Sequence, residues 1–417
     1  MKVFRALVIV ATLAALAVPA TARADAVTDW NLHSSNALFN TAGQAPTVGV
    51  LHLAMVHGAV YDAVNTIDRR YQPYLYQPGR FTTRRPLPWT SREAAAATAA
   101  YRVLVSIVPA QQVALEQLYL ASLAGIPEWS ARGGIAVGEA AAAAMIAART
   151  NDGRFGTPGF PTGLLPGQWR PVLPALANDP AAWLRNVKPF LIERSSQFRS
   201  AGPQPLASAG YAAEFNEVTS LGQDSSTTRT FFQTNAARYW AENPPRTWSR
   251  VFRTLSAQEG LSLEENARLY AMLYTTAADA LISVWDDKAY WGFWRPITAI
   301  READADPNPA TAADPSWLPL IPNPPYPEHS SGHTGLSGSI VATLQQFFGK
   351  DDIAWSDTNV GGLSRSFTYL SEAIGEIVDA RIWSGIHFRS ADVQGAMIGV
   401  QVAHWRQAHY FQPLRGR

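Results

Sequence analysis

Apolar residues recur at helical spacing along most of the chain. Over Val48–Ile67 they follow steps of three and four residues and form a broad apolar face, which predicts an α-helix. Alternation of apolar and polar residues with period two is nearly absent, so a sheet fold is not expected. The same helical spacing predicts further helices over Arg92–Ile107, Ala110–Ala124, Ala131–Arg149, Ala212–Leu221, Ser225–Ala241, Thr247–Leu255, Gly332–Phe348, Ser364–Ile382 and Ala391–Ala408. The pattern as a whole predicts an all-α protein.

The longest helical pattern runs from Ser262 to about Ala299. Ser262 with Glu265 three residues later has the form of a capping box, which marks the start of a helix, and Gly292 is a candidate break. Long loops are expected where proline and glycine are dense, over Asn151–Pro174 and over Asp304–Pro327, which contains eight prolines.

The first 24 residues have the form of a secretory signal peptide. A basic start is followed by the apolar run Ala6–Val18, which is too short to span a bilayer comfortably, and Ala22-Arg23-Ala24 supplies a small-x-small cleavage pattern. No later stretch of about twenty uninterrupted apolar residues is found. We therefore expect a secreted or periplasmic protein with no membrane span after cleavage.

We expect residues 25–417 to form a single all-α domain, with an N-terminal helical half at 25–174 and a C-terminal half at 175–417 that carries the chemistry. Lys and Arg number 34 against 33 Asp and Glu, a net charge of +1, so nothing favours nucleic acid as a partner. There is no cysteine, which excludes disulfides, thiolate nucleophiles and cysteine-based metal centres. Any anion site must be a local concentration of cations.

The first candidate cluster pairs Lys288 with Arg295 on an aromatic-rich segment. Seven residues at about 100° per residue return almost to the same face of a helix, so the two cations would lie one above the other. The alternative is a pair of surface cations that partner Asp286 and Asp287.

The second cluster is Ser331-Gly332-His333, where the proline-rich loop meets an apolar helix. Unpaired N–H groups at a helix start favour an anion, and His333 would stand beside that anion as a proton donor or acceptor. The alternative is an N-cap serine with an incidental histidine. His329 and His333 also imitate a metal pair, but no third ligand with matching spacing is evident.

The third cluster contains Arg381, His387 and Asp392. Ser384-Gly385 suggests that a helix ends there, which would let His387 turn back toward Arg381. Asp392 could then hold one ring nitrogen and leave the other free to attack or coordinate. The alternative is a core histidine with a surface Arg–Asp pair. Together the three clusters supply three cations, a helix entrance and two histidines, which is what a tetrahedral or trigonal-bipyramidal oxyanion requires.

These motifs resemble the vanadium-dependent haloperoxidase and type 2 phosphatidic acid phosphatase superfamily, whose pattern is K-x6-R-P, then P-S-G-H, then S-R-x5-H-x3-D. The first part is intact, Ser330 replaces the proline of the second, and in the third Ala380 replaces the serine while Asp392 falls one residue late. The stretch Ala54–Asn65 is similar to bacterial secreted members of the haloperoxidase branch. The resemblance implies a helical bundle of the vanadium haloperoxidase and acid phosphatase type, with a buried vanadate or phosphate pocket.

The resemblance also implies a role for each motif residue. His387 would be the apical vanadium ligand, or the nucleophile of a phosphatase, His333 the acid–base group, and Lys288 the residue that polarises bound peroxide. The oxyanion would be held by Lys288, Arg295, Ser331, Gly332 and Arg381. Trp285 and Tyr326 match positions where chloroperoxidase-like members place aromatic side chains near the halide.

The favoured function is a vanadate-dependent haloperoxidase that oxidises halide with hydrogen peroxide to hypohalous acid, with an organic acceptor as a further partner. The first alternative is a secreted acid phosphatase that needs no cofactor and hydrolyses phosphate esters through a phosphohistidine. The second is a non-catalytic anion-binding helical protein. The resemblance leaves a homo-oligomer open. His57 and Asp62 are explained by no motif; they are either buried polar groups that tie helices together or part of the pocket wall.

Overall fold

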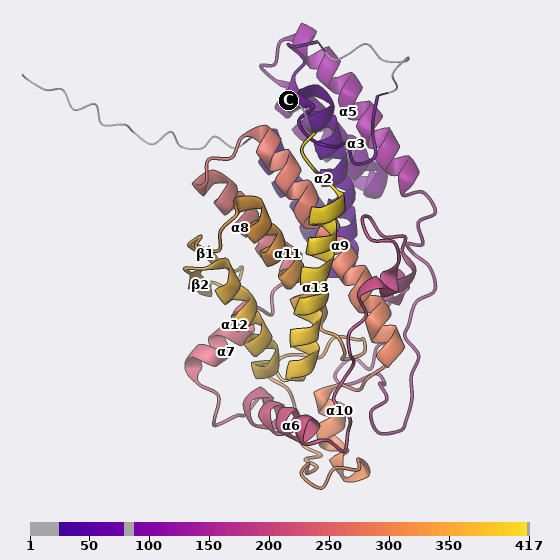
Figure 1. The fold of residues 1–417 in the computed structure, drawn as a ribbon, viewed down its shortest axis with the longest axis vertical. Coiled ribbons are helices and arrows are strands. Elements are labelled where there is room, and N and C mark those ends of the chain that lie inside the picture. Colours follow the sequence, from indigo (N-terminus) through magenta and orange to yellow (C-terminus); the bar gives the residue numbers. More distant parts are fainter. Residues whose placement is uncertain (1–24, 79–86, 415–417) are drawn as a thin grey trace, which may run out of the picture.

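The computed structural model describes residues 25–78 and 87–414, and these are mostly helical (Figure 1). The helices are α1 (Ala26–Ser35), α2 (Pro46–Asp68), α3 (Arg92–Ile107), α4 (Gln112–Leu123), α5 (Glu128–Ala148), α6 (Ala209–Gly222), α7 (Phe231–Tyr239), α8 (Pro244–Gln258), α9 (Leu263–Trp291), α10 (Pro296–Arg301), α11 (Gly332–Phe348), α12 (Leu370–Trp383) and α13 (Arg389–His409). Short 3-10 or π turns occupy Asn36–Thr41, Pro109–Gln111, Ala182–Asn186, Ser195–Phe198 and Ala303–Ala305. The expected all-α class is confirmed.

The long helical pattern after Ser262 ends where its glycine predicts. Ser262 caps α9, and the reciprocal hydrogen bonds with Glu265 form the capping box. Gly292 follows the last helical residue with φ +52°, the left-handed conformation in which glycine commonly ends a helix. The chain then re-enters a helix at Pro296, whose fixed φ suits a first turn.

Two predicted helices are shorter than their apolar patterns indicated. The prediction over Ser225–Ala241 is wrong at its start, because Thr230 caps α7 and the helix begins only at Phe231. The prediction over Ser364–Ile382 is wrong in the same way, since Ser364–Phe367 is strand β2, which pairs antiparallel with β1 (Trp355–Thr358). The rings of Trp355 and Phe367 face each other across this hairpin, 4.7 Å apart, and their burial outweighs the helical spacing.

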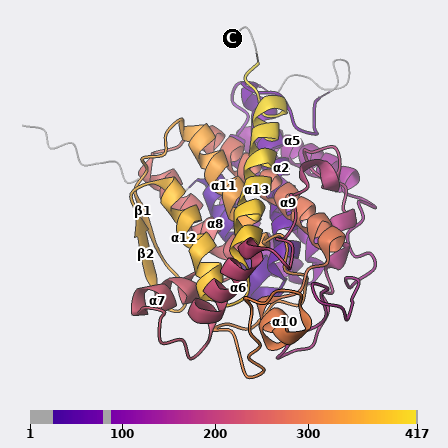
Figure 2. The same ribbon diagram turned by 60° about the horizontal axis from the view of Figure 1, so that its bottom comes forward.

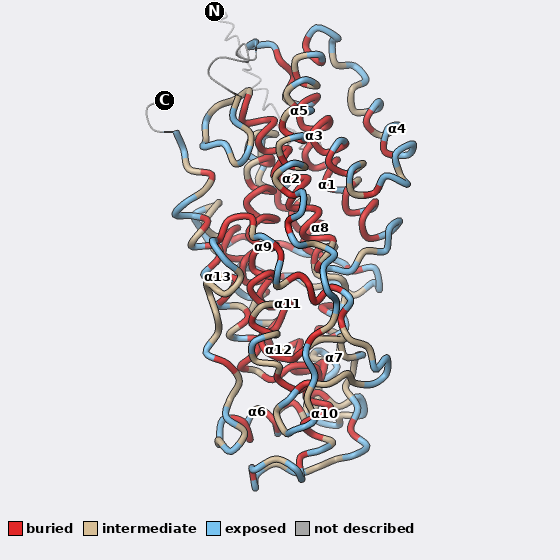
Figure 3. The backbone as a smooth tube through the Cα atoms, turned by 90° about the vertical axis from the view of Figure 1, so that its right-hand side faces the viewer, coloured by how far each residue is buried: buried red, intermediate tan, exposed pale blue. Residues whose placement is uncertain are grey.

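The bundle is built around α9, which is buried along most of its length (Figure 3). Helices α11 and α13 run beside α9, while α6 and α10 lie at the end of the molecule opposite α3 and α5 (Figures 1 and 2). Glycines let α11 and α13 approach closely: a Cβ added at Gly399 would lie 2.1 Å from the carbonyl oxygen of Gly335. This seam fixes the first turn of α11 against the middle of α13.

Two helices of the described residues are long and apolar enough, by length and composition, to cross a membrane. One is α2, which is buried in the core; the other is α5, which packs on α3 through Gly134 and Gly138. The predicted signal peptide lies outside the described residues. The first described helix, α1, begins at Ala26 with Asp25 as its N-cap. The division into an N-terminal and a C-terminal half stays a prediction.

His57 and Asp62 are buried groups that tie segments together. The ring of His57 stacks on Tyr274 at 4.8 Å between centroids and contacts the amide of Asn31 at 3.1 Å. The carboxylate of Asp62 accepts backbone N–H bonds from three successive residues, Tyr74 to Tyr76, at 2.7 to 2.8 Å. The commoner of the two interpretations therefore accounts for both side chains.

Candidate oxyanion site

The three motif clusters meet at one end of the bundle. Lys288 ends α9, and its ammonium donates to the carbonyl oxygens of Pro327 and Glu328 at 2.7 and 3.0 Å. Arg295 caps α10, and its guanidinium donates to the carbonyl of Ile386 at 2.8 Å. Segments that lie about 40 to 90 positions apart in the sequence are thus in direct contact. The side chains of Lys288 and Arg295 are fully buried, so they are not surface cations.

The ring of His387 has one tautomer that fits its neighbours. Nη1 of Arg295 lies 3.2 Å from Nε2 of the ring, and because a guanidinium can only donate, Nε2 must carry the lone pair. The proton is therefore on Nδ1, which lies 2.9 Å from Oε1 of Glu328. The same oxygen accepts the N–H of Phe388 at 2.9 Å. The free nitrogen that a ligand or nucleophile needs is Nε2.

Glu328, and not Asp392, holds His387. The expectation that Asp392 orients the ring is wrong, since neither of its carboxylate oxygens has a hydrogen-bond partner among the described residues. Asp392 lies in the first turn of α13 and faces Ser331 and Arg381, which oppose the burial that raises its pKa to about 8. The orienting carboxylate, Glu328, comes from the loop before α11. This loop contacts the connection between α12 and α13 through the hydrogen bonds of Glu328 to His387 and Phe388.

Burial dominates the electrostatics of the site. It lowers the pKa of Lys288 well below its ordinary value, and the neighbouring Arg295 lowers it further. It lowers the pKa of Arg295 to about 10 and raises the pKa of Glu328 to about 8. It also lowers the pKa of His387 well below its ordinary value, and three neighbouring cations add to that effect. The imidazole is therefore neutral near neutral pH.

At the start of α11, the backbone N–H of Ser331 is not available to an anion, contrary to the expectation of unpaired N–H groups there. Ser331 is the N-cap, but its own N–H donates to the carbonyl of Ala391 at 3.0 Å. Its contribution to an anion would be the buried hydroxyl, which faces the carboxyl group of Asp392. Gly332 begins the helix, and a Cβ there would lie 2.8 Å from the ring of Trp285, so only glycine fits. N–H groups of this first turn have no intrahelical acceptor.

His333 stands beside the edge of Trp240, with the ring centroids 6.1 Å apart. Its Nε2 has no partner among the described residues, and burial together with Arg381 lowers its pKa well below the ordinary value. Arg381 in turn donates to the carbonyl of Trp240 at 3.4 Å. His329 does not join His333, because its ring turns to Ser200, with Nε2 and Oγ 3.0 Å apart.

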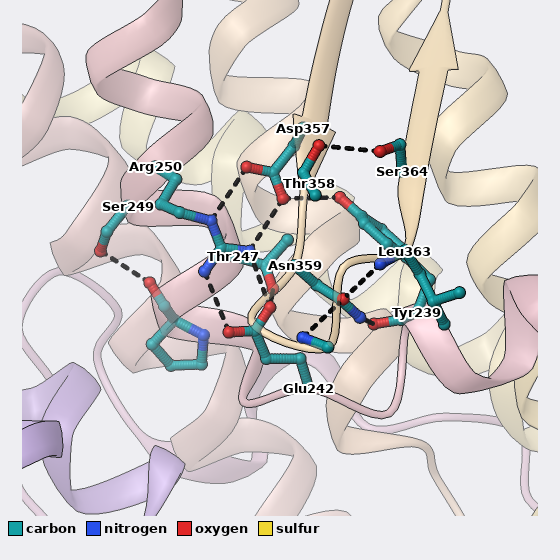
Figure 4. Close-up of polar contacts among 12 residues, drawn as sticks. Tyr239, Glu242, Thr247, Ser249, Arg250, Asp357, Thr358, Asn359, Leu363 and Ser364 are labelled. Atoms are coloured by element: carbon teal, nitrogen blue, oxygen red, sulfur yellow. Dashed lines mark hydrogen bonds and ion pairs between the residues drawn. The ribbon is translucent and has the colours of Figure 1, made fainter.

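Trp240 is held by a polar cluster at the end of α7 (Figure 4). Arg250 forms ion pairs with Glu242 at 2.7 Å and with Asp357 at 2.8 Å, and Tyr239 donates to Asp357 at 2.9 Å. This cluster ties the hairpin to α8 and fixes the residue next to Trp240. It thereby supports the wall against which His333 lies.

The two aromatic residues expected near a halide are neighbours. The rings of Trp285 and Tyr326 are tilted against each other, with centroids 4.9 Å apart, and the ammonium of Lys288 lies 4.9 Å from the Tyr326 ring. The indole N–H of Trp285 donates to Asp179 at 2.9 Å. They therefore form an aromatic wall on the Lys288 side of the site.

Residues 268–416 match the family model of the VCPO second helical-bundle domain. This part of the chain, which carries the three motif clusters, is therefore similar to that helical-bundle domain. Over 221 residues it is 26% identical to vanadium chloroperoxidase from Curvularia inaequalis, an alignment that covers 45% of this chain and 36% of that relative. The match thus spans little more than a third of the curated relative.

Two solved structures have the same fold. The crystal structure described as the first bacterial vanadium-dependent iodoperoxidase has a TM-score of 0.80 and 22% identity, and the match covers 94% of this chain and 98% of that one. A holo-type bacterial vanadium-dependent chloroperoxidase has a TM-score of 0.68 and 18% identity, with 88% and 93% covered. The haloperoxidase helical fold therefore extends over both halves of the chain.

The residues of the site fit vanadate. Buried polar atoms without a partner among the described residues come from all three motifs: Nη2 of Arg295, Nε2 of His333 and Nε of Arg381. Buried polar groups are normally paired, so these three unpaired atoms indicate a polar guest. The donors are cationic or neutral, and the described residues contain no group of three or more acidic, cysteine or histidine side chains that could hold a metal cation. An oxyanion suits this donor set.

Proposed function

We propose that this protein is a vanadate-dependent haloperoxidase that oxidises a halide with hydrogen peroxide to hypohalous acid. One halide ion, one peroxide and one proton yield one hypohalous acid and one water. The observation that carries the proposal is the pair of unpaired cationic donors, Nη2 of Arg295 and Nε of Arg381, near the unprotonated Nε2 of a neutral His387. The family and fold support it, since the relatives are named as chloroperoxidase and iodoperoxidase.

In this proposal Arg295 and Arg381 would bind oxyanion oxygens with their free N–H groups, and Nε2 of His387 would hold the vanadium. The ammonium of Lys288 donates two of its three N–H bonds to the carbonyl oxygens of Pro327 and Glu328. The third N–H can donate to a bound oxyanion. Vanadate, when bound, would supply the activation of hydrogen peroxide toward two-electron oxidation of the halide. The chain provides charge neutralisation and orientation in a site from which water is largely excluded.

His333 moves the proton in this scheme. Its lowered pKa makes it a base near neutral pH, so Nε2 can take a proton from incoming peroxide and return one to the departing oxygen. Trp285 and Tyr326 line the halide approach, because the positive edges of aromatic rings accommodate a weakly hydrated anion. Lys288 adds its charge to that wall.

We also propose that the protein is exported. The basic, apolar and small-residue order of the first 24 residues supports this, and the N-cap of α1 at Asp25 would be the first residue after cleavage. Expression of the full chain in a bacterium, followed by N-terminal sequencing of the periplasmic product, tests it. A first residue of Asp25 is expected, whereas a product that retains Met1 would contradict the proposal.

The activity is tested by halogenation of monochlorodimedone with hydrogen peroxide and chloride, bromide or iodide, after reconstitution with vanadate. The wild-type protein should be active with at least one halide, and His387→Ala should be inactive in all three. Phosphate-ester hydrolysis without vanadate is measured in parallel. Hydrolysis that vanadate inhibits, together with no halogenation at any vanadate concentration, would show that the protein is a phosphatase instead.

A further inference from the structure

A second set of polar side chains, among them a buried arginine with unpaired donors, lies at the other end of the same three helices. Arg268 is near the start of α9, Gln346 is in the last turn of α11, and Arg406 is in the last turn of α13. Lys288 and Ser331 lie at the opposite ends of α9 and α11. At 1.5 Å per residue, helix lengths separate the two sets by about 20 to 30 Å. In Figure 1 this end of α13 leads toward the C-terminus.

Arg406 is a fully buried cation, with 0% of its surface exposed. Its Nη2 donates to the side-chain oxygen of Gln346, but Nε and Nη1 have no partner among the described residues. Burial is the main cause that lowers the pKa of Arg406 to about 9, and the charge of the nearby Arg268 contributes to the same shift. The amide nitrogen of Gln346 is likewise buried and unpaired. Three buried donor atoms on Arg406 and Gln346 are thus left without an acceptor among the described residues.

Arg268 adds positive charge without adding a counter-ion. Its guanidinium lies over the ring of Tyr71 at 4.3 Å and near the ring of Phe347 at 5.6 Å. Its Nε donates to the carbonyl of Phe411 at 3.2 Å. The charged groups that act on Arg268 and Arg406 include tyrosines and each other but no Asp or Glu among the described residues. Two neighbouring cations therefore lack a negative partner.

An uncompensated buried guanidinium is costly, and its unpaired N–H groups add to that cost. The negative ends of α11 and α13 help to stabilise the charge. They do not pair Nε and Nη1 of Arg406 or the amide of Gln346. A buried water molecule would supply acceptors but no charge. A small anion would supply both.

We propose that a small inorganic monoanion binds between Arg406, Arg268 and Gln346 and joins the ends of α9, α11 and α13. Chloride is the abundant anion of this kind. The site is separate from the oxyanion site, and it binds its anion as a structural link and not as a substrate. The proposal therefore stands or fails independently of the haloperoxidase activity.

Anomalous diffraction tests the proposal directly. Crystals of the wild-type protein are soaked in sodium bromide, and the anomalous difference map is inspected around the guanidinium of Arg406. A bromide peak within about 3.5 Å of Nη1 or Nε of Arg406 is expected, the range of an N–H hydrogen bond extended for a large anion. Density for water alone, with bromide only at other positions, would overturn the proposal.

Thermal unfolding tests it in solution. Bromide is compared with gluconate, an anion too large to enter, at the same ionic strength and without vanadate. With a dissociation constant of about 1 mM, about 100 mM bromide should raise the wild-type midpoint by about 2 to 3 °C over gluconate. Arg406→Met should lose this difference. Gln346→Met, which keeps the cation, should retain less than half of it.

Arg102→Met is the matched control, because Arg102 is an exposed arginine of α3 whose guanidinium pairs with Glu139 of α5 at 2.7 Å. This variant should keep the full bromide difference. Equal midpoints of the wild type in bromide and gluconate would contradict the proposal. The same holds if the bromide difference persists in Gln346→Met and in Arg406→Met. If Arg406→Met does not fold, the proposal is tested by the bromide difference of Gln346→Met and by the anomalous map of the bromide-soaked wild-type crystals.

Discussion

The orienting pair of Glu328 and His387 gives the sharpest test of the site. Oε1 of Glu328 accepts two N–H bonds, from Nδ1 of His387 and from the backbone of Phe388, both at 2.9 Å. Glu328→Ala removes both acceptors, frees the ring to rotate and allows the tautomer with its proton on Nε2. Loss of such a second partner behind a metal-ligating histidine costs about 10- to 100-fold in metal affinity. We therefore expect vanadate to bind about 10- to 100-fold more weakly to Glu328→Ala.

Glu328→Gln is the matched variant, because its amide oxygen can accept the same two bonds without a charge. We expect its vanadate affinity to stay within about threefold of the wild type at pH 7, where burial already favours the protonated form of Glu328. Equilibrium dialysis of vanadate measures the affinities, and circular dichroism confirms that each variant is folded. Asp392→Asn is measured alongside, since it reports on the alternative orienting group.

The reasoning would be refuted if Glu328→Ala bound vanadate with the same affinity as the wild type. It would also be refuted if Asp392→Asn, and not Glu328→Ala, lost vanadate binding. In the first case the hydrogen bond at Nδ1 does not control the ligand. In the second case the ring would turn to Asp392 when the oxyanion binds. A loss that is equal in Glu328→Ala and Glu328→Gln would show that charge, and not orientation, is what Glu328 supplies.

Three further substitutions test the packing behind the site. Gly332→Ala would place a Cβ 2.8 Å from Trp285, and we expect a loss of stability of about 1 to 3 kcal/mol with weaker vanadate binding, measured by denaturant unfolding and dialysis. Gly399→Ala would place a Cβ 2.1 Å from a backbone oxygen of α11, and its thermal midpoint should fall by a few degrees because the two helices must separate. Asp279→Asn should cost about 2 to 4 kcal/mol in urea unfolding, because Asp279 accepts three backbone N–H bonds and an amide offers only one acceptor oxygen.

Sequence spacing predicted most helices of this fold, because their burial follows the same three- and four-residue steps. α3 and α11 begin and end at the residues expected. α1 was missed because its apolar positions are few and its start lies next to the predicted signal sequence. The hairpin β1–β2 was missed because Ser364–Phe367 is too short to show an alternation, and its pairing partner is a separate segment.

In the site as well, the sequence identified the motif residues but not the contacts between segments that are distant in the sequence. Spacing and motif order marked Lys288, Arg295 and the two histidines as candidates. The expectation that Lys288 and Arg295 share one helix face is wrong, because α9 ends at Trp291 and Arg295 caps α10. Spacing could not assign Glu328 to His387, since the contact joins residues 59 positions apart and depends on how the proline-rich loop folds back. Nor could it show that the N–H of Ser331 is used by Ala391, which depends on the close approach of α11 and α13.

The charge balance of the site leads to a last prediction, on pH. Burial raises the pKa of Glu328 and of Asp392 to about 8, so both carboxyl groups are largely neutral at pH 7 while Arg295 and Arg381 keep their charge. As pH rises through 8, each carboxyl group becomes negative inside the cationic site, and an anion is repelled. Lys288 acts in the same direction, because its lowered pKa means that it gives up its positive charge at a lower pH than usual.

Anion affinity should therefore fall as pH rises from about 7 to 9, by roughly tenfold for each group that changes its charge within the site. Vanadate itself changes its protonation state in this pH range. The dissociation constant of the wild type is therefore divided by that of Glu328→Gln at the same pH, which removes the effect of the ligand's own ionisation. Glutamine cannot ionise, and the ratio of wild type to variant should rise with pH in dialysis between pH 7 and 9. A ratio that stays constant would mean that the carboxyl group of Glu328 is already ionised at pH 7. The cationic excess of the free site would then be one charge smaller, and an oxyanion would have less positive charge to neutralise.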